Sequence, residues 1–204
     1  MPLLKYNRLK KNSVCDKIKK KDFFMNIWHD IESSRITPED FIAVVEINKG
    51  SKQKYEMDKK TGLLRLDRIL YTSTHYPANY GFIPHTLAAD NDPLDVLILC
   101  SESLVPMSLV ECYPIGVIVM NDGGAMDEKI IAIPFADPNY NTYKDISDLP
   151  SHIFEEMRHF FCVYKQLEGK ASTVDVTADR NEAVKIIASS MESYKKNLYS
   201  LTAK

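Results

Sequence analysis

The sequence predicts an α+β fold, in which a small antiparallel sheet or barrel is covered by helices. Two observations support this prediction. Short segments between Phe41 and Pro134 are rich in β-branched residues or alternate between apolar and polar side chains, and after Pro150 the apolar residues recur at steps of three and four. Because no repeat, low-complexity tract or Gly/Ser linker divides the chain, we expect a single domain over residues 25–204, preceded by a basic extension over residues 1–24.

The expected strands all lie in the first two thirds of the chain. They are residues 41–47, 52–57, 63–69, 96–99, 112–120 and 129–134, and turn-forming residues separate the first three of them. Residues 76–93 contain three prolines and Gly81, so we expect a long irregular loop there. A long ordered loop inside a domain usually serves function.

Two helices are expected in the last third of the chain. The first covers residues 150–167, where apolar side chains have helical spacing. The second begins near Asp179, because Glu182 stands three residues later, as in a capping box. Its apolar stripe contains Ile187, Met191 and Tyr194.

Charge is distributed unevenly along the chain. Residues 1–21 contain eight of the 26 lysines and arginines but only one of the 28 acids, which leaves 18 basic and 27 acidic residues in the rest. A basic segment of this kind is usually a solvated extension, although it can also contact nucleic acid or an anionic surface. The acidic body argues against nucleic-acid binding and favours metal ions or metal-bound substrates.

Several classes of protein are excluded by composition. The longest apolar run, residues 130–136, is far shorter than the roughly 20 residues of a membrane-spanning helix, and the first 24 residues contain no apolar core of signal-peptide length. The four cysteines form no CxxC pair, so we expect neither a zinc site nor a disulfide framework, and we predict a reducing, cytoplasmic location. No GxGxxG or P-loop motif is present, which excludes Rossmann-type and P-loop nucleotide binding.

The most informative segment is Asp90-Asn91-Asp92-Pro93-Leu94-Asp95, directly before an apolar strand. Pro93 interrupts strand pairing and can bend the chain so that the three carboxylates converge. Asp122 and Asp127 have the same separation as Asp90 and Asp95, and they flank a Gly-Gly turn. Two loops with two carboxylates each make an oxygen-only site, which suits Mg²⁺ or Mn²⁺ and not zinc. For either pair alone, an Asp-stabilised turn between strands is the more common explanation.

Cationic and phenolic side chains form a second group of candidates. Its members are Lys54, Arg68, Tyr80, Tyr164 and Lys165. Taken singly, such residues are typical of solvated strand cations and half-buried tyrosines. Around a metal site they are the groups that bind the oxygens of a phosphate.

These motifs resemble those of the soluble family I inorganic pyrophosphatases of the bacterial type. Residues 90–95 match the D-x-D-P-x-D signature of that family, and residues 76–81 resemble its Y-P-x-N-Y-G element. Also similar are Lys54-Tyr55-Glu56, Asp67-Arg68, Asp122 with Asp127 and Lys129, and His159-Phe160-Phe161 before Tyr164-Lys165. The resemblance runs from about Phe41 to the C-terminus, in the order of the family and near its spacing.

The resemblance implies a five-stranded OB-like β-barrel flanked by two C-terminal helices, and hydrolysis of pyrophosphate to two phosphates with several Mg²⁺ ions per site. It implies metal coordination by Asp90, Asp95, Asp122 and Asp127, with Glu46 and Glu56 nearby. It makes Asp92 the base that accepts a proton from the attacking water. It implies that Lys54, Arg68, Tyr80, Tyr164 and Lys165 hold the phosphates, with Lys129 in support. It also implies a homo-oligomer, with a hexamer favoured.

The chain departs from the family pattern in three places. Gly123 stands where many bacterial members carry an acid, the segment between Glu46 and Lys54 is one residue shorter, and the N-terminal extension is longer. The alternative function is a non-catalytic OB-type module that binds nucleic acid or another anion. The acidic residues expected at the site disfavour it, and we expect neither a nucleic-acid nor a membrane partner. Phosphate release from pyrophosphate with Mg²⁺ separates the two functions.

Overall fold

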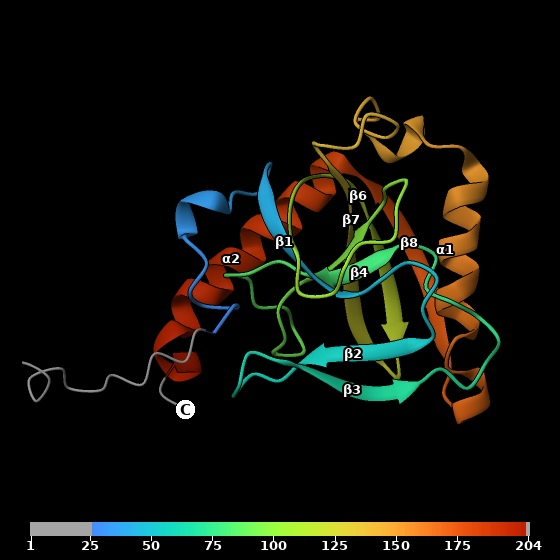
Figure 1. Cartoon of the computed structure of the whole chain (residues 1–204), viewed down its shortest axis with the longest axis horizontal. Helices are drawn as coiled ribbons and strands as arrows, with labels where there is room; N and C mark the ends of the chain where they lie inside the picture. Colours follow the sequence, from blue (N-terminus) through green and yellow to red (C-terminus); the bar gives the residue numbers. More distant parts are fainter. Residues whose placement is uncertain (1–25, 203–204) are drawn as a thin grey trace, which may run out of the picture.

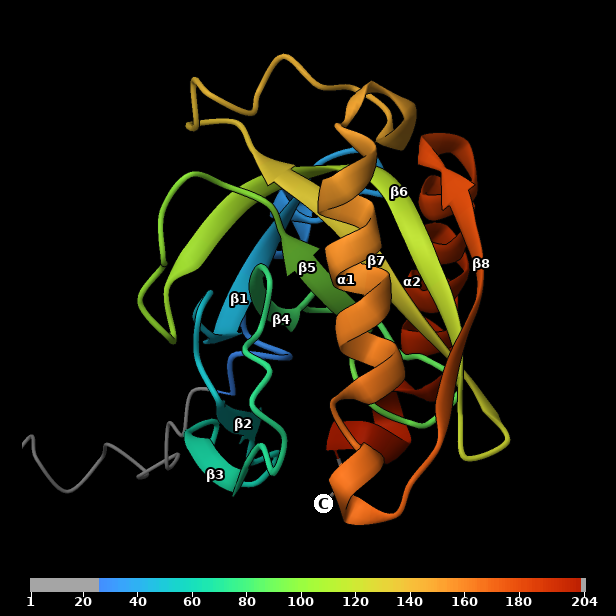
Figure 2. The ribbon, with the colours of Figure 1, turned by 90° about the vertical axis from the view of Figure 1, so that its right-hand side faces the viewer.

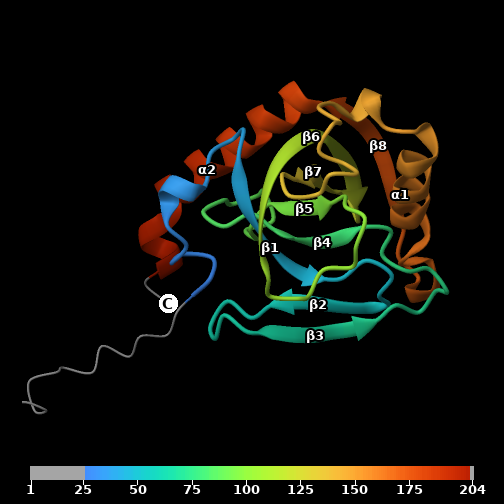
Figure 3. The same ribbon diagram turned by 45° about the horizontal axis from the view of Figure 1, so that its top comes forward.

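A closed ring of strands forms the centre of the molecule in the computed structural model, which describes residues 26–202. The strands of the ring are, in order, β1 (Phe41–Ile47), β4 (Asn79–Phe82), β5 (Asp95–Ile98), β7 (Ala125–Pro134) and β6 (Leu109–Asp122), and β6 pairs again with β1. Figure 3 shows this ring with its helices outside. The five-stranded OB-like barrel is thereby confirmed. We expected every pair of strands to be antiparallel, but β5 and β7 run parallel.

Two of the expected strands lie outside the barrel. β2 (Gln53–Met57) and β3 (Leu64–Ile69) pair only with each other, as a separate two-stranded sheet. This hairpin lies beside the barrel (Figures 1 and 2). A register shift after Lys54 places Arg68 opposite Lys54 and Leu66 opposite Tyr55, so that Asp67 is an extra residue in β3. The hairpin therefore brings charged side chains to the barrel without belonging to its wall.

β4 corrects the expectation of an irregular loop over residues 76–93. It is fully buried and pairs with β1 on one side and β5 on the other. Gly81 makes the pairing with β1 close, because a Cβ atom on Gly81 would lie 1.8 Å from the carbonyl oxygen of Val44. The barrel wall at this point therefore requires a residue without a side chain.

Two helices cover different sides of the barrel, as expected (Figure 3). α1 (Ser151–Val163) packs Met157, Phe160 and Phe161 against the core, and α2 (Arg180–Thr202) packs Ala183 and Ile187. The structure also contains short 3₁₀ helices: η2 (Ser33–Arg35), η3 (Ile146–Asp148) and η4 (Gln166–Glu168). No helix within residues 26–202 has the length and apolar character needed to cross a membrane.

The C-terminal third differs from expectation in two ways. The first helix ends at Val163, four residues earlier than expected, and η4 follows it. A strand that we did not predict, β8 (Ser172–Asp179), pairs with the outer side of β6 and leads directly into α2. The Asp179 carboxylate accepts a hydrogen bond of 3.0 Å from the Glu182 backbone N–H, which confirms the start of the second helix. The basic extension expected over residues 1–24 lies outside the described residues.

Candidate active site

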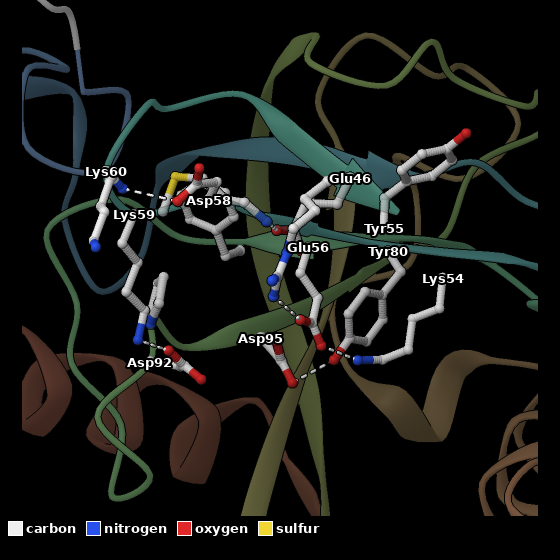
Figure 4. Close-up of a pocket in the computed structure, with 14 residues that line it drawn as sticks. Glu46, Lys54, Tyr55, Glu56, Asp58, Lys59, Lys60, Tyr80, Asp92 and Asp95 are labelled. Atoms are coloured by element: carbon white, nitrogen blue, oxygen red, sulfur yellow. Dashed lines mark hydrogen bonds and ion pairs between the residues drawn. The ribbon is translucent and has the colours of Figure 1, made fainter. Parts of the chain in front are cut away.

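A cavity of about 440 Å³ lies between the β2–β3 hairpin and the barrel. Its polar lining includes Glu46 of β1, Lys54 and Glu56 of β2, Tyr80 of β4, Asp95 of β5, and Asp92 of the loop before β5. Figure 4 shows Lys54, Glu56, Tyr80 and Asp95 close together, with Asp92 and Lys59 at the other side. Three barrel strands and the hairpin therefore direct charged side chains into one space.

Lys129 joins two of the predicted metal ligands next to this cavity. Its Nζ donates hydrogen bonds of 2.7 Å to Asp95 and 2.9 Å to Asp127, and another of 3.1 Å to the Tyr80 hydroxyl. The parallel pairing of β5 with β7 places Asp95 beside Lys129, and Asp127 lies two residues earlier on the same face of β7. The Lys129 side chain is only 3% exposed. Burial lowers its pKa, but Asp95 and Asp127 outweigh that effect and raise the pKa above its ordinary value, so Lys129 stays charged.

Asp90 lies close enough to the other acids to interact with them. Burial and the charges of Asp92, Asp95 and Asp127 raise the pKa of its carboxyl, although the Asp92 backbone N–H, 3.0 Å from Oδ1, acts in the opposite direction. Asn91 has a φ of 67°, so the chain turns sharply between the two acids. Asp92, Pro93 and Asp95 all line the cavity, in agreement with the bend expected at Pro93. The loop thus crowds carboxylates that repel one another.

Asp122 has a different cationic partner from Asp95 and Asp127. Lys165 donates a hydrogen bond to its carboxylate, from the segment that follows α1. The Lys165 Nζ also lies 5.1 Å from the centre of the Tyr164 ring. Tyr164 is buried and stacks on Phe160 at 5.1 Å between ring centres. Three of the four predicted ligands therefore contact a lysine, and Asp90 does not.

Arg68 belongs to a network of ion pairs, but one nitrogen of its guanidinium group has no hydrogen-bond partner within residues 26–202. Its Nε donates to Glu168 at 2.8 Å, and its Nη1 donates to Asp67. Lys54 donates to Glu56 and lies 3.4 Å from Asp67. The Arg68 Nη2 is buried and has no hydrogen-bond partner among residues 26–202. A buried cationic donor without a partner is costly, so this group suits an anionic ligand.

Asp92, the predicted base, lies at the rim of the cavity. Its side chain is 52% exposed and forms an ion pair with Lys59 of the hairpin turn. The Lys59 Nζ also donates to the Asn91 carbonyl at 3.1 Å and lies 5.7 Å from the centre of the Trp28 ring. Lys59 therefore connects the hairpin to the loop that carries the acids.

Sequence reasoning assigned no role to three residues that the structure places in these networks. They are Lys59, Asp67 and Glu168. Asp67 directly precedes Arg68, and this adjacency was an available signal. In a regular strand, however, neighbouring side chains point to opposite faces, and only the extra residue in β3 lets both join one network. Lys59 lies in a polar turn and Glu168 beyond the penultimate helix, where no pattern distinguishes them from solvated residues.

The donor set fits a hard divalent cation. Within residues 26–202, no three His, Cys, Asp or Glu side chains are grouped as a metal cage, and the acids bind lysines instead. Burial and neighbouring acids raise the pKa values of Asp90 and of the buried Glu46, so added positive charge would favour the ionised form of both. All the available donors are oxygens, which favour Mg²⁺ or Mn²⁺.

Several known proteins similar to this chain are inorganic pyrophosphatases. A family model described as inorganic pyrophosphatase matches residues 43–195. The soluble inorganic pyrophosphatase of Zea mays is 49% identical over 167 residues, which cover 82% of this chain and 78% of that protein. A soluble inorganic pyrophosphatase of Solanum tuberosum is 47% identical over 181 residues, which cover 89% and 86%. The solved inorganic pyrophosphatase of Thermus thermophilus superposes with a TM-score of 0.80 and 36% identity, and the match covers 84% of this chain and 99% of that one.

Proposed function

The chain belongs to the inorganic pyrophosphatase family and hydrolyses pyrophosphate to two phosphates, and from this premise we propose how its side chains do so. The observation that supports the proposal most is that Asp95 and Asp127 share one buried lysine beside a charged cavity, while Asp90 lies near enough for their charges to raise its pKa. We assign these three acids and Asp122 to metal binding, with several Mg²⁺ ions per site and Mn²⁺ as a substitute. Bound Mg²⁺ supplies positive charge that lowers the pKa of the attacking water and neutralises pyrophosphate.

Asp92 acts as the general base in this proposal. Its carboxylate accepts a proton from the attacking water as the oxygen of that water bonds to phosphorus and the bridging P–O bond breaks. Two observations support this role: Asp92 lines the cavity, and its side chain is open to solvent. The ion pair with Lys59 orients the carboxylate, because it holds one side of the group against the hairpin.

Five side chains bind the phosphate oxygens. They are Lys54, Arg68, Tyr80, Tyr164 and Lys165, with Lys129 in support. The unpartnered Nη2 of Arg68 supports this role directly. Burial and the charge of Asp95 raise the pKa of Tyr80 well above its ordinary value, so its hydroxyl keeps the proton that it donates. Cationic donors on the departing phosphate stabilise the charge that develops there.

Substitution of three aspartates tests the division between ligands and base. Asp90→Asn and Asp95→Asn should weaken metal binding, and excess Mg²⁺ should restore part of their turnover. Asp92→Asn should lower turnover by about 10²–10⁴-fold, the usual contribution of a general base, while metal and pyrophosphate still bind. The measurement is phosphate release against Mg²⁺ concentration for the three variants, with calorimetric binding of Mg²⁺ alongside.

The matched design makes the outcome specific to Asp92. All three variants replace an acid by its amide within six consecutive residues, so general damage to this segment would affect all of them. If excess Mg²⁺ restores Asp92→Asn as well as Asp90→Asn, then Asp92 is a ligand and another group is the base.

Metal exchange tests the oxygen-only site. Turnover should disappear with EDTA and return with Mg²⁺, whereas Ca²⁺ should bind without supporting turnover. Calcium is larger and accepts irregular coordination, so the carboxylates would hold it in a different arrangement. Phosphate release with each metal, and competition of Ca²⁺ against Mg²⁺, measure this. Equal turnover with both metals would contradict the proposed ligand set.

The assembly and location of the protein are also proposals. We propose a homo-oligomer, with a hexamer favoured, because the match covers 99% of the bacterial pyrophosphatase of Thermus thermophilus. Light scattering during size-exclusion chromatography measures its mass.

We propose the cytoplasm as the location of the protein, because Cys100, Cys112 and Cys162 are free thiols, which persist in reducing compartments. Membership of the pyrophosphatase family does not favour the non-catalytic binding module.

A further inference from the structure

A shallow groove of about 800 Å³ lies outside the barrel, between the sheet and the first turns of α2. Its apolar lining is Val119 of β6, Met126 of β7, Val176 and Ala178 of β8, and Ile186 of α2. Met126 is 64% exposed and Val176 is 54% exposed. Apolar side chains that gather in an exposed groove indicate a surface that another segment covers.

The remaining side chains of the groove are mostly acidic. They are Glu128, Asp179, Asn181, Glu182 and Lys185. Lys185 donates to Glu182 at 2.9 Å, whereas the side chain of Glu128 makes no hydrogen bond or ion pair within residues 26–202. The groove therefore suits a partner with both cationic and apolar side chains.

We propose that the basic N-terminal segment of this chain, residues 1–24, docks in this groove. Residues 1–21 contain eight lysines and arginines with short apolar pieces between them, whereas the rest of the chain is acidic. Its ammonium groups meet Glu128 and Glu182, and its apolar side chains cover Met126 and Val176. Complementary charge orients such a contact, and the apolar floor stabilises it.

The start of the described chain places this segment within reach of the groove. The His29 ring nitrogen Nδ1 lies 2.7 Å from the hydroxyl of Tyr194 on α2. Tyr194 lies eight residues along α2 from Ile186, about 12 Å at the rise of a helix. Twenty-four extended residues span up to about 80 Å, so the segment reaches the groove without strain. Because the segment is tethered, its effective concentration is on the order of millimolar, and a weak contact is enough to occupy the groove.

Zero-length crosslinking of the full chain tests the proposal. A carbodiimide joins a lysine amine to a carboxylate only when the two are in contact, and mass spectrometry of the digested monomer identifies the pairs. We expect lysines of residues 1–24 to couple to Glu128, Asp179 or Glu182. The double variant Glu128→Gln/Glu182→Gln should reduce the total coupling of those lysines about fivefold, which corresponds to about 1 kcal/mol. Coupling should also fall in 1 M KCl, where charges are screened beyond about 3 Å.

A matched double variant and isotope labelling make every outcome decisive. Glu155→Gln/Glu156→Gln removes two exposed carboxylates from α1, outside the groove, and should leave the coupling unchanged. Equal coupling to groove and α1 carboxylates would overturn the proposal. The reaction is also run on a mixture of unlabelled and ¹⁵N-labelled chains. Coupled peptides that combine the two isotopes would show that a second copy occupies the groove, and would overturn docking within one chain.

Discussion

Glu46 is a buried acid in the wall of the active site, with only 7% of its surface exposed. Its Oε1 accepts a hydrogen bond of 2.7 Å from the backbone N–H of Met57. Burial and the nearby charge of Asp95 raise the pKa of Glu46 from 4.5 to about 8. Between these two values the folded chain therefore holds a proton that the unfolded chain releases. Under the linkage relation, the free energy of unfolding then falls as the pH rises through this window.

Glu46→Gln should remove much of this pH dependence. In EDTA, the free energy of unfolding of the unmodified chain should fall between pH 5 and pH 8.5 by on the order of 3 kcal/mol more than that of the variant, because each unit of pKa shift corresponds to about 1.4 kcal/mol. Urea unfolding at a series of pH values measures the difference.

Glu56→Gln is the matched control for this effect. Glu56 lines the same cavity, but its side chain is 42% exposed, so its variant should keep most of the pH dependence of the unmodified chain. A Glu46→Gln curve parallel to that of the unmodified chain would show that Glu46 is ionised in the folded protein at pH 7.

At the scale of the elements, Gly81 determines how closely β4 approaches β1. Gly81→Ala should lower the free energy of unfolding by about 3 kcal/mol or more, because its Cβ would overlap the backbone of Val44 and no flexible side chain is there to yield. Gly50→Ala is the comparison. Gly50 has a φ of 82° and no atom within 4 Å of the added Cβ, so only its backbone conformation should cost stability, by about 1 kcal/mol. Urea unfolding of both variants measures the two costs, and equal losses would show that β4 can move away from β1.

The strands that the sequence predicted and those it missed differ in what stabilises them. The prediction for β1 was correct at both ends, because its residues are mostly apolar and β-branched and all are buried. β4 has only four residues between Pro77 and Pro84, and it is a strand because β1 and β5 flank it. β8 pairs only with β6 and has a single buried residue, so it lacks an apolar pattern. Both missed strands depend on partners that lie far away in the sequence.

The same limit applies to the candidate site. The acid-rich loop over residues 90–95 could be predicted because its residues are consecutive. The contact of Lys129 with Asp95 could not, because it depends on the parallel register of β5 and β7. The contact of Arg68 with Glu168 joins residues that are 100 positions apart. The sequence therefore identified both the acids and the candidate cations, whereas the pairing of each cation with its acid required the folded chain.

At the scale of the whole molecule, we expect the basic segment to take no part in the chemistry. Deletion of residues 1–21 should change kcat/KM by no more than about twofold, the range of ordinary surface changes, because no proposed ligand or phosphate contact lies there. The groove that we assign to the segment lies outside the barrel, and none of its lining residues lines the active-site cavity. Steady-state kinetics of the full chain and of the truncated chain measure the change in kcat/KM, and the mass of each in solution is the control. A large loss of turnover at unchanged mass would show that the segment acts at the active site.

Closure of the ring also determines when this protein can begin to fold. β1 pairs with β6 through Phe41 and Cys112, which are about 70 residues apart. One edge of β5 can pair only after β7 has been synthesised. A nascent chain that ends before Pro134 therefore cannot complete the barrel, and its early strands expose unpaired edges on which other chains can assemble. Contacts between distant segments also slow folding, typically to milliseconds or seconds. The arrangement that holds the mature acids in place thus leaves the growing polypeptide exposed to aggregation until most of it has been synthesised.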